Sequence, residues 1–426
     1  MKMAEIASRI GKIVETVLGI DLPVSIRAWD GSSIIKHNSP TLSFNSLHAM
    51  RHLLWSPSEL GLARAYISGA VDLEGDVFEF FHHVAGSLGA KRSLGARELA
   101  SVIKDAIASG SLGPRPALPP EETRASRKGL RHSVRSDKKS ISHHYDVGND
   151  FYELILGPSM VYSCAYFDPV NATTTPLEQA QSAKLDLVCS KLDLTEGMRL
   201  LDVGCGWGSM VIHAAKHYNV KAVGITLSDE QARFARQRVV DEGLMDSVEI
   251  RVQDYREISD GPFDAISSIG MAEHVGRLQF QQYCEILYGL LRPGARLLNH
   301  QISRRPGPDQ TSSAFIQRYV FPDGELLPLA HTVESLEAAG FEVRDIESLR
   351  EHYALTLRQW VSNLENSWSQ CAELVGEGRS RVWRTYMAGS AIAFEQNRIG
   401  LNQILAVKTE PTGDAHLPYR TRHWVV

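Results

Sequence analysis

Met198-Arg-Leu-Leu-Asp-Val-Gly-Cys-Gly-Trp-Gly-Ser209 is the stretch from which the fold of this chain is deduced. Its apolar residues predict a short buried strand that includes Asp202, and Gly204, Gly206 and Gly208 follow at alternate positions. Glycines in this pattern are typical of a tight turn where a ligand lies against bare backbone. Beyond the last glycine, apolar residues recur at helical spacing. A strand, a glycine loop and a helix in this order are how open α/β sheets hold nucleotide-like ligands at the carboxyl ends of their strands.

The loop differs from phosphate-binding signatures, because it has neither their glycine spacing nor their lysine. Asp202, an acid two residues before Gly204, suits a ligand that is neutral or cationic at that point. S-adenosylmethionine (SAM), an adenosine that carries a methionine in place of phosphates, meets this requirement. From this stretch alone, another nucleotide or a plain tight turn remains open.

The chain of 426 residues is long enough for two or three domains. Its 43% hydrophobic content and formal net charge of −5 are typical of a soluble globular protein and do not indicate nucleic-acid binding. No apolar run reaches the ~18 residues of a membrane helix, and charged residues within Met1–Ile20 predict an amphipathic helix instead of a signal peptide. The five scattered cysteines indicate neither disulfides nor a metal site, so we expect a cytoplasmic protein without a metal.

Composition divides the chain into three segments. Because residues 1–108 contain no group of candidate catalytic residues, we expect a smaller N-terminal accessory domain there. We expect a Pro/Gly linker with a basic segment over residues 109–140, and the catalytic domain over residues 141–426. Within Arg124–Lys139, seven basic residues accompany one acidic residue. Such a run is a solvated face or binds an anionic partner. Near an anionic membrane, each basic residue would contribute ~1 kcal/mol of binding free energy. Because no aromatic residues interleave with it, the run favours phospholipid headgroups over nucleic acid.

Strand-like runs alternate with helical runs in the catalytic segment, which predicts an α/β fold with a doubly wound, mostly parallel sheet. The carboxyl ends of parallel strands meet at one edge of such a sheet. We therefore expect the residues at five strand ends to converge: Gly204, Thr226, Asp254, Glu273 and His300.

Two sets of residues at this edge carry the predicted chemistry. For the donor, Thr226 and Gln231 are neutral groups placed to bind ribose hydroxyls, Asp254 lies where an adenine amino group would lie, and Tyr255 could stack on the purine. The second set is Glu273, His300, Tyr353 and Cys164, which could stabilise a developing cation or hold a small anion that acts as a base. Alternatively, Glu273 and His300 are a structural pair that orients a loop.

Four motifs, in this order, resemble those of cyclopropane fatty acid synthases and the related mycolic acid methyltransferases. They are Val161-Tyr-Ser-Cys-Ala-Tyr-Phe167, Leu201-Asp-Val-Gly-Cys-Gly-Trp-Gly208, Gly224-Ile-Thr-Leu-Ser-Asp-Glu-Gln231 and Gly270-Met-Ala-Glu-His-Val-Gly276. The resemblance covers about residues 141 to 400 and implies a class I, Rossmann-like SAM methyltransferase. The N-terminal segment looks like that of the longer, phospholipid-acting synthases.

The resemblance also implies roles for individual residues. Contacts to SAM are implied for Tyr162, Ser163, the Leu201–Ser209 loop, residues 226–231 and Tyr255. A bicarbonate-like anion is implied among Cys164, Glu273, His300 and Tyr353. In that family the alkene of an acyl chain attacks the SAM methyl group, the anion takes a proton from the new methyl group, and the ring closes. A short-lived cation requires a dry, aromatic-lined pocket. We expect phospholipid acyl chains at a membrane surface as the partner, with peripheral membrane association.

Two positions depart from the family pattern. Ser390 stands where many synthases have a cysteine, and Gln301 follows His300 where an apolar residue is common. Because we expect both near the anion, Ser390 joins the predicted catalytic residues and the product stays open. We predict a cyclopropane-fatty-acyl-phospholipid synthase. The alternatives are a methylene-branched product, with a reductase partner, and a non-catalytic lipid-binding homologue. The sequence leaves a homodimer open.

Overall fold

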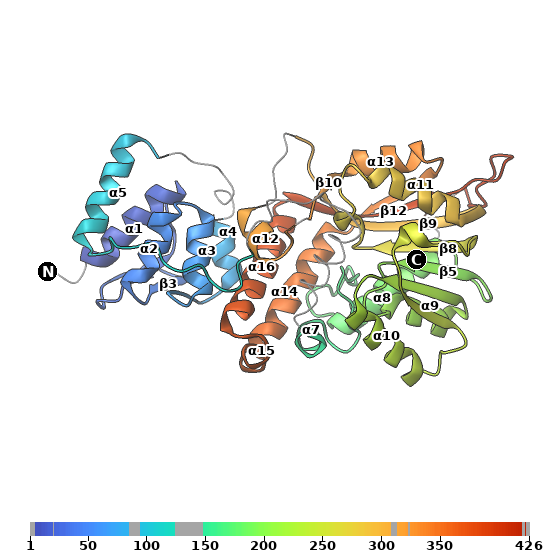
Figure 1. The fold of residues 1–426 in the computed structure, drawn as a ribbon, viewed down its shortest axis with the longest axis horizontal. Coiled ribbons are helices and arrows are strands. Elements are labelled where there is room, and N and C mark those ends of the chain that lie inside the picture. The colour runs from blue at the N-terminus through green and yellow to red at the C-terminus, as the bar shows by residue number, and fades with distance from the viewer. Residues whose placement is uncertain are drawn as a thin grey trace. The chain divides into compact units, whose positions relative to one another are not determined.

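The computed structural model describes residues 5–19, 21–84, 94–123, 148–307, 313–322, 324–419 and 422 (Figure 1). The chain forms two compact units. The first comprises Met1–Ser126, Thr311–Pro322 and Leu364–Ala393, and the second comprises Arg127–Gln310, Asp323–Asn363 and Phe394–Val426. Each unit therefore combines segments that are far apart in the sequence, whereas the predicted domains are contiguous. The basic run Arg124–Lys139 lies outside the described residues and stays a prediction.

The second unit is built on the predicted mostly parallel sheet, with strand order β11-β12-β9-β8-β5-β6-β7 and β10 (Leu327–Pro328) beside β9. The parallel strands are β5 (Arg199–Val203), β6 (Lys221–Thr226), β7 (Val248–Val252), β8 (Phe263–Ile269) and β9 (Leu291–Arg304). From β5 the chain proceeds to β6 and β7, and it then returns to β8 on the other side of β5. The sheet therefore has its switch point between β5 and β8, where α/β folds bind ligands.

Helices cover both faces of this sheet (Figure 1). One face carries α8 (Leu177–Leu192), α9 (Ser209–Tyr218) and α10 (Asp229–Asp241), and the other carries α11 (Phe280–Leu290) and α13 (Leu329–Ala338). Because side chains alternate along a strand, Leu298 of β9 joins the α8 layer and Leu297 joins the α11 layer. The same alternation determines which face each functional side chain of β9 occupies.

Two C-terminal strands, which the sequence analysis did not predict, extend the sheet. β12 (Ile399–Val407) pairs antiparallel with β9 and places Gln403 opposite His300. β11 (Glu342–Ser348) pairs antiparallel with β12. The remaining elements of this unit are α7 (Asn149–Leu156), η1 (Tyr255–Glu257), η2 (Ala272–His274) and most of α14 (Arg350–Asn366).

The first unit contains a small sheet of order β2-β1-β3-β4: β1 (Ser25–Arg27), β2 (Ser33–Ile34), β3 (Thr41–Phe44) and β4 (Val71–Glu74). Its helices are α1 (Glu5–Leu18), α2 (Leu47–Trp55), α3 (Glu59–Ile67), α4 (Val77–Val84), α5 (Ala96–Ala108), α12 (Ala314–Tyr319), α15 (Trp368–Val375) and most of α16 (Glu377–Glu395). The predicted N-terminal amphipathic helix is α1, whose Ile10, Val14 and Val17 are buried at helical spacing.

A buried polar network connects distant segments of the first unit. The Arg64 guanidinium donates two hydrogen bonds, of 2.7 and 2.6 Å, to the Glu122 carboxylate. The Tyr319 hydroxyl donates to the same carboxylate at 3.0 Å. These contacts link α3 and α12 to Glu122, which lies within the predicted linker. Within the described part of the chain, no helix is both long and apolar enough to cross a lipid bilayer.

Candidate active site

The glycine loop after β5 has the unusual backbone that its sequence predicts. Gly204, Gly206 and Gly208 have φ angles of +86°, +53° and +82°, a region that side chains disfavour. The amides of Gly204 and Cys205 both donate to the Ile225 carbonyl, at 3.0 and 2.8 Å, and so hold the loop against the end of β6. A Cβ atom at Gly204 would lie 3.2 Å from Met271 Cβ. The loop therefore presents bare backbone at the switch point.

A cavity opens beside this loop at the carboxyl edge of β5, β6, β7 and β8. Its wall comprises Val203, Gly204, Gly206, Ile225, Thr226, Leu227, Gln231, Gln253, Asp254, Tyr255, Arg256, Gly270, Met271, His274 and Val275. The predicted convergence of Gly204, Thr226 and Asp254 is confirmed. Of the other predicted donor-site residues, Gly206, Gln231 and Tyr255 line the cavity, whereas Tyr162, Ser163, Asp202 and Gly208 are not part of its wall.

A neutral hydrogen-bonded pair stands at the end of β6. Thr226 Oγ1 donates to Gln231 Oε1 at 2.9 Å, and both residues are buried. Ser228 caps α10 by accepting from the Gln231 amide at 3.2 Å. This arrangement fixes the Gln231 side chain over the loop, where its Nε2 lies 3.9 Å from the position of a Cβ on Gly206. The end of β6 therefore offers amide and hydroxyl groups to a ligand.

Beyond β7, Asp254 is part of an ion pair that the sequence analysis did not predict. Its carboxylate accepts from Arg256 Nε and Nη2 at 2.7 and 2.6 Å. Arg256 also lies over the Tyr255 ring, with 5.2 Å between the guanidinium carbon and the ring centroid. Tyr283 packs edge-on against the Tyr255 ring, with 5.3 Å between the ring centroids. Tyr255 is thus held in one orientation at the cavity wall.

A buried lysine accompanies Asp202 on the α8 face of the sheet. Asp202 accepts a hydrogen bond of 2.7 Å from Ser267 Oγ, and burial raises the pKa of its carboxyl to about 6. Lys184 of α8 is buried, and burial lowers the pKa of its ammonium to about 8. The two opposite charges partly offset each other's pKa shifts. The loop itself has no lysine, but helix α8 provides a cation near its acid.

Lys184 also determines the environment of the Tyr162–Cys164 segment. Its Nζ donates to Ser163 Oγ at 2.8 Å, and Gln181 Nε2 donates to the Ser163 carbonyl at 2.9 Å. The Cys164 thiol donates to the Ala165 carbonyl at 3.1 Å. Burial raises the pKa of this thiol far above its ordinary value, so Cys164 is a neutral thiol and not a nucleophile.

Glu273 reaches the backbone of β9 just past the end of β8. β8 ends opposite His300, so the Ile302 amide has no partner on that strand, and it donates to Glu273 Oε1 at 2.7 Å. Glu273 Oε2 is buried and has no hydrogen-bond partner among the described residues. Burial raises the pKa of this carboxyl to about 7, because the charged form is poorly solvated.

His300 occupies the α8 face of β9, and it is buried. Its Nδ1 contacts Gln403 Nε2 at 3.2 Å, whereas its Nε2 has no partner in the part of the chain that the structure describes. Burial, reinforced by Lys184 and Lys191, lowers the pKa of the imidazole far below its ordinary value. His300 is therefore a neutral imidazole, and like Glu273 it retains one buried polar atom for a ligand.

Aromatic rings form a continuous cluster from the glycine loop to Tyr353. Adjacent ring centroids lie 4.8 to 6.0 Å apart along the series Trp207, Tyr152, Tyr162, Trp360 and Tyr353. Tyr353 also packs on Phe394, at 4.9 Å. Of these rings, the sequence analysis assigned site roles to Tyr162, to Tyr353 and, as part of the glycine loop, to Trp207. The cluster supplies an apolar environment with ring faces that favour positive charge.

The side chains of Gln301 and His300 lie on opposite faces of β9, although the sequence analysis expected Gln301 near the anion. Adjacent residues of a strand point to opposite faces, and Gln301 Nε2 donates to Thr332 Oγ1 of α13 at 2.6 Å. Asn299, on the same face, donates to Gln301 Oε1 at 2.8 Å. Ser390 belongs to the first unit, whereas Cys164, Glu273, His300 and Tyr353 belong to the second, so its role stays a prediction.

A glycine loop at the switch point of a mostly parallel sheet, with neutral and acidic groups at the next two strand ends, defines a class I SAM-dependent methyltransferase. The chain belongs to the mycolic acid cyclopropane synthetase family, whose model matches residues 132–404.

Comparison with individual proteins agrees with this assignment. A probable fatty acid methyltransferase of Mycobacterium tuberculosis is 42% identical over 408 residues, which cover 93% of this chain and 94% of the relative. The cyclopropane-fatty-acyl-phospholipid synthase of Escherichia coli K12 is 37% identical over 262 residues, or 62% of this chain and 66% of the relative. The crystal structure of mycolic acid cyclopropane synthase CmaA1 complexed with SAH and CTAB matches with a TM-score of 0.60 and 34% identity, covering 64% of this chain and 98% of that chain.

Proposed function

We propose that this enzyme transfers the methyl carbon of SAM to the double bond of an unsaturated phospholipid acyl chain and closes a cyclopropane ring. The observation that carries the proposal is a pair of buried atoms, Glu273 Oε2 just past β8 and His300 Nε2 on β9, that have no hydrogen-bond partner among the described residues. The relative named as a phospholipid synthase supports this choice of acceptor.

The residues of the cavity fit SAM. The bare backbone of the glycine loop would lie against the donor, and the Thr226–Gln231 pair would bind hydroxyl groups of the ribose. Asp254 and Tyr255 would meet the adenine. When bound, SAM supplies an electrophilic methyl group on a positively charged sulfur.

The remaining chemistry concerns the acyl chain. The π electrons of the alkene would take up the methyl group that SAM supplies, and the carbon–sulfur electron pair would stay on sulfur. Positive charge would then develop on the acyl chain, and the ring faces of the aromatic cluster would stabilise it. Loss of a proton from the new methyl group leaves the electron pair that closes the three-membered ring.

A bicarbonate-like anion would satisfy both Glu273 Oε2 and His300 Nε2. We assign the neutral His300 proton to Nε2, which would donate to such an anion, and Glu273 Oε2 would accept from its hydroxyl. When bound, the anion supplies the base that removes the proton. Tyr353 is the further predicted ligand in the same unit.

A methylene-branched product is the second candidate. Gln301 and Ser390, the two departures from the family pattern, both suggested it. The Gln301 side chain faces α13, so this residue no longer supports a methylene-branched product. The candidate now rests on Ser390 alone, so we favour cyclopropanation.

NMR of the product lipid tests the proposal. The full-length enzyme would be incubated with SAM and phosphatidylglycerol that carries one oleoyl chain. High-field ring protons are expected, whereas vinylidene protons would assign the methylene-branched product. A methyl group found only on a heteroatom would overturn both candidates.

A further inference from the structure

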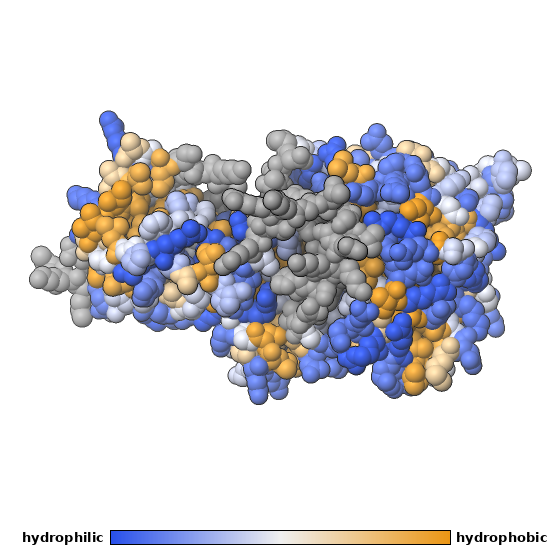
Figure 2. All heavy atoms as spheres, viewed as in Figure 1, coloured by the Kyte–Doolittle hydropathy of each residue, from blue (hydrophilic) through white to orange (hydrophobic). Residues whose placement is uncertain are grey.

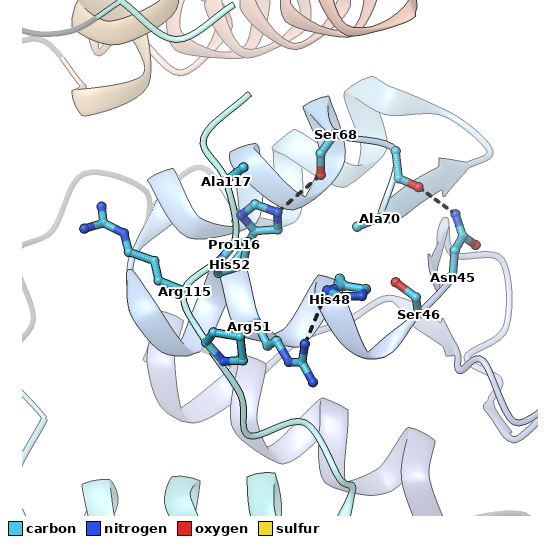
Figure 3. A pocket seen from close by; sticks show the side chains of 12 residues that line it. Asn45, Ser46, His48, Arg51, His52, Ser68, Ala70, Arg115, Pro116 and Ala117 are labelled. Atoms are coloured by element: carbon cyan, nitrogen blue, oxygen red, sulfur yellow. Dashed lines mark hydrogen bonds between the residues drawn. The ribbon is translucent and has the colours of Figure 1, made fainter. Parts of the chain in front are cut away.

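The first unit has a polar pocket of its own, with a volume of ≈490 Å³. The start of α2, the turn after α3 and residues 114–117 form its walls (Figure 3). Small-molecule sites span about 300–1,000 Å³, so the pocket is large enough for more than a single ion. No role assigned so far to this chain involves it.

The charged residues that line the pocket are both basic. Arg51 and Arg115 contribute to its walls together with His48 and His52, and no carboxylate of the described residues does so. Five other arginines of the same unit each make an ion pair with a carboxylate: Arg9, Arg27, Arg64, Arg381 and Arg384. Neither Arg51 nor Arg115 has such a partner within the described ranges. The pocket is therefore an unneutralised positive site.

Arg51 is the best-defined group for a ligand. Its Nη1 lies 3.5 Å from His48 Nδ1 (Figure 3). Its Nη2 lies 3.4 Å from the Leu112 carbonyl, and both distances are at the outer limit for hydrogen bonds. Its Nε is buried and has no partner in the described chain. A buried donor without an acceptor costs free energy, and an oxyanion in the pocket would remove that cost.

The N-terminus of α2 adds a second positive element. Ser46 occupies the N-cap position and lines the pocket, but its side chain makes no capping hydrogen bond within the described structure. The exposed amide groups of a helix N-terminus and the helix dipole both favour an anion. A guanidinium beside a helix N-terminus is the donor set that binds phosphate oxygens.

We propose that this pocket binds a phosphate ester, and that the headgroup of a membrane phospholipid supplies it. The inference rests on the proposed phospholipid acceptor. Apolar residues in the same unit favour a lipid source: Leu99, Ile103 and Ile107 of α5 are 48%, 42% and 61% exposed at four-residue spacing (Figure 2). Exposed Leu112 follows, and its carbonyl is the one that Arg51 contacts. An apolar stripe leading to a phosphate site is suited to a bilayer surface.

Binding to two probes tests the pocket with the full-length protein. The first probe is glycerophosphoglycerol, titrated calorimetrically, and the second is vesicles of phosphatidylglycerol, assayed by co-sedimentation. We expect Arg51→Gln to weaken binding of both at least ~10-fold. The double variant His48→Gln/Arg115→Gln changes exposed residues only, so it keeps the test valid if Arg51→Gln does not fold. Lys12→Gln is the control, because it removes one charge from an exposed residue of α1 outside the pocket.

Each outcome decides a different point. The proposed phosphate site would be refuted if the wild type and the pocket variants bound the probes equally. It would also be refuted if Lys12→Gln weakened binding as much as the pocket variants do. Binding of glycerophosphoglycerol without any binding of vesicles would overturn the lipid source. Lipid methylation is measured in parallel, on detergent-dispersed lipid. If the wild type methylates lipid but Arg51→Gln binds the headgroup as well as the wild type does, only the proposed phosphate site is rejected. If Arg51→Gln weakens headgroup binding but the wild type does not methylate lipid, only the proposed function is rejected.

Discussion

Gln403 and His300 lie opposite each other on antiparallel strands, and the Gln403 amide nitrogen contacts His300 Nδ1 at 3.2 Å. The amide orientation follows from Lys191, whose ammonium donates to Gln403 Oε1 at 2.7 Å. An ammonium only donates, so the amide NH₂ must face the imidazole and Nδ1 must accept. The neutral ring therefore carries its proton on Nε2, the atom without a partner among the described residues.

Gln403→Met should remove this control of the tautomer. We expect turnover to fall about tenfold while SAM affinity stays unchanged, because the ring would no longer present a fixed Nε2–H donor. ¹⁵N NMR of the His300 ring would report the tautomer directly. Gln301→Met is the matched control, since Gln301 faces α13 on the other side of β9. An equal loss of turnover in both variants would refute the role of Gln403.

Glu273→Gln should lower turnover by ~10²-fold and leave SAM affinity nearly intact. The amide preserves the shape of the side chain, and its oxygen can still accept from the Ile302 amide. An NH₂ group then replaces Oε2, and this group donates hydrogen bonds but can neither accept one nor titrate. Single-turnover kinetics would separate the chemical step from binding. A comparable loss of SAM affinity would show that Glu273 belongs to the donor site instead.

The same carboxyl should make stability depend on pH. Its pKa is about 7 in the folded protein against 4.5 for an ordinary glutamate, so between these values the folded state binds a proton that the unfolded state does not. The contribution of this carboxyl to the stability of the folded state is thus fully present below pH 4.5 and is lost as pH rises through 7. Relative to Glu273→Gln, the free energy of unfolding of the wild type should fall by about 3 kcal/mol over this range. Urea denaturation of both proteins at pH 5 and pH 8 would check this, and parallel pH profiles would contradict it.

Gly204→Ala should abolish most SAM binding. The substitution places a Cβ at a φ of +86° and 3.2 Å from Met271 Cβ, in the wall of the donor cavity. Gly243→Ala provides the control, because its φ is +68° but a Cβ there meets nothing within 4 Å. We expect Gly243→Ala to cost about 1 kcal/mol of stability and to bind SAM normally. Calorimetric titration and thermal denaturation would measure both quantities.

The donor side of the site was predictable from sequence because its residues directly follow strands that the local sequence pattern predicts. These strands are β5, β6 and β7, and their parallel arrangement brings Gly204, Thr226 and Asp254 to one edge of the sheet. The partner of Asp254 was not predicted, although Arg256 is only two residues away. The sequence does not show whether a charged side chain just after a strand points to solvent or to a neighbouring side chain.

The surroundings of His300 depend on contacts that sequence patterns do not contain. Lys184 and Lys191 lie on α8, where a lysine is normally exposed, yet both are buried. Gln403 arrives on a strand that was not predicted, because an apolar run such as Ile404–Val407 can also belong to a helix. The expected position of Gln301 was wrong for a simpler reason: it was judged by proximity in sequence, whereas alternate residues of a strand face opposite layers.

The antiparallel insertion of β12 has a consequence for synthesis of the chain. The lining of the donor cavity is complete at Val275, whereas the side chain that orients His300 comes from Gln403. Every residue that lines the donor cavity therefore leaves the ribosome before Gln403, the partner of the imidazole. During that interval the growing polypeptide holds all the lining residues of its donor cavity and lacks the residue that orients His300.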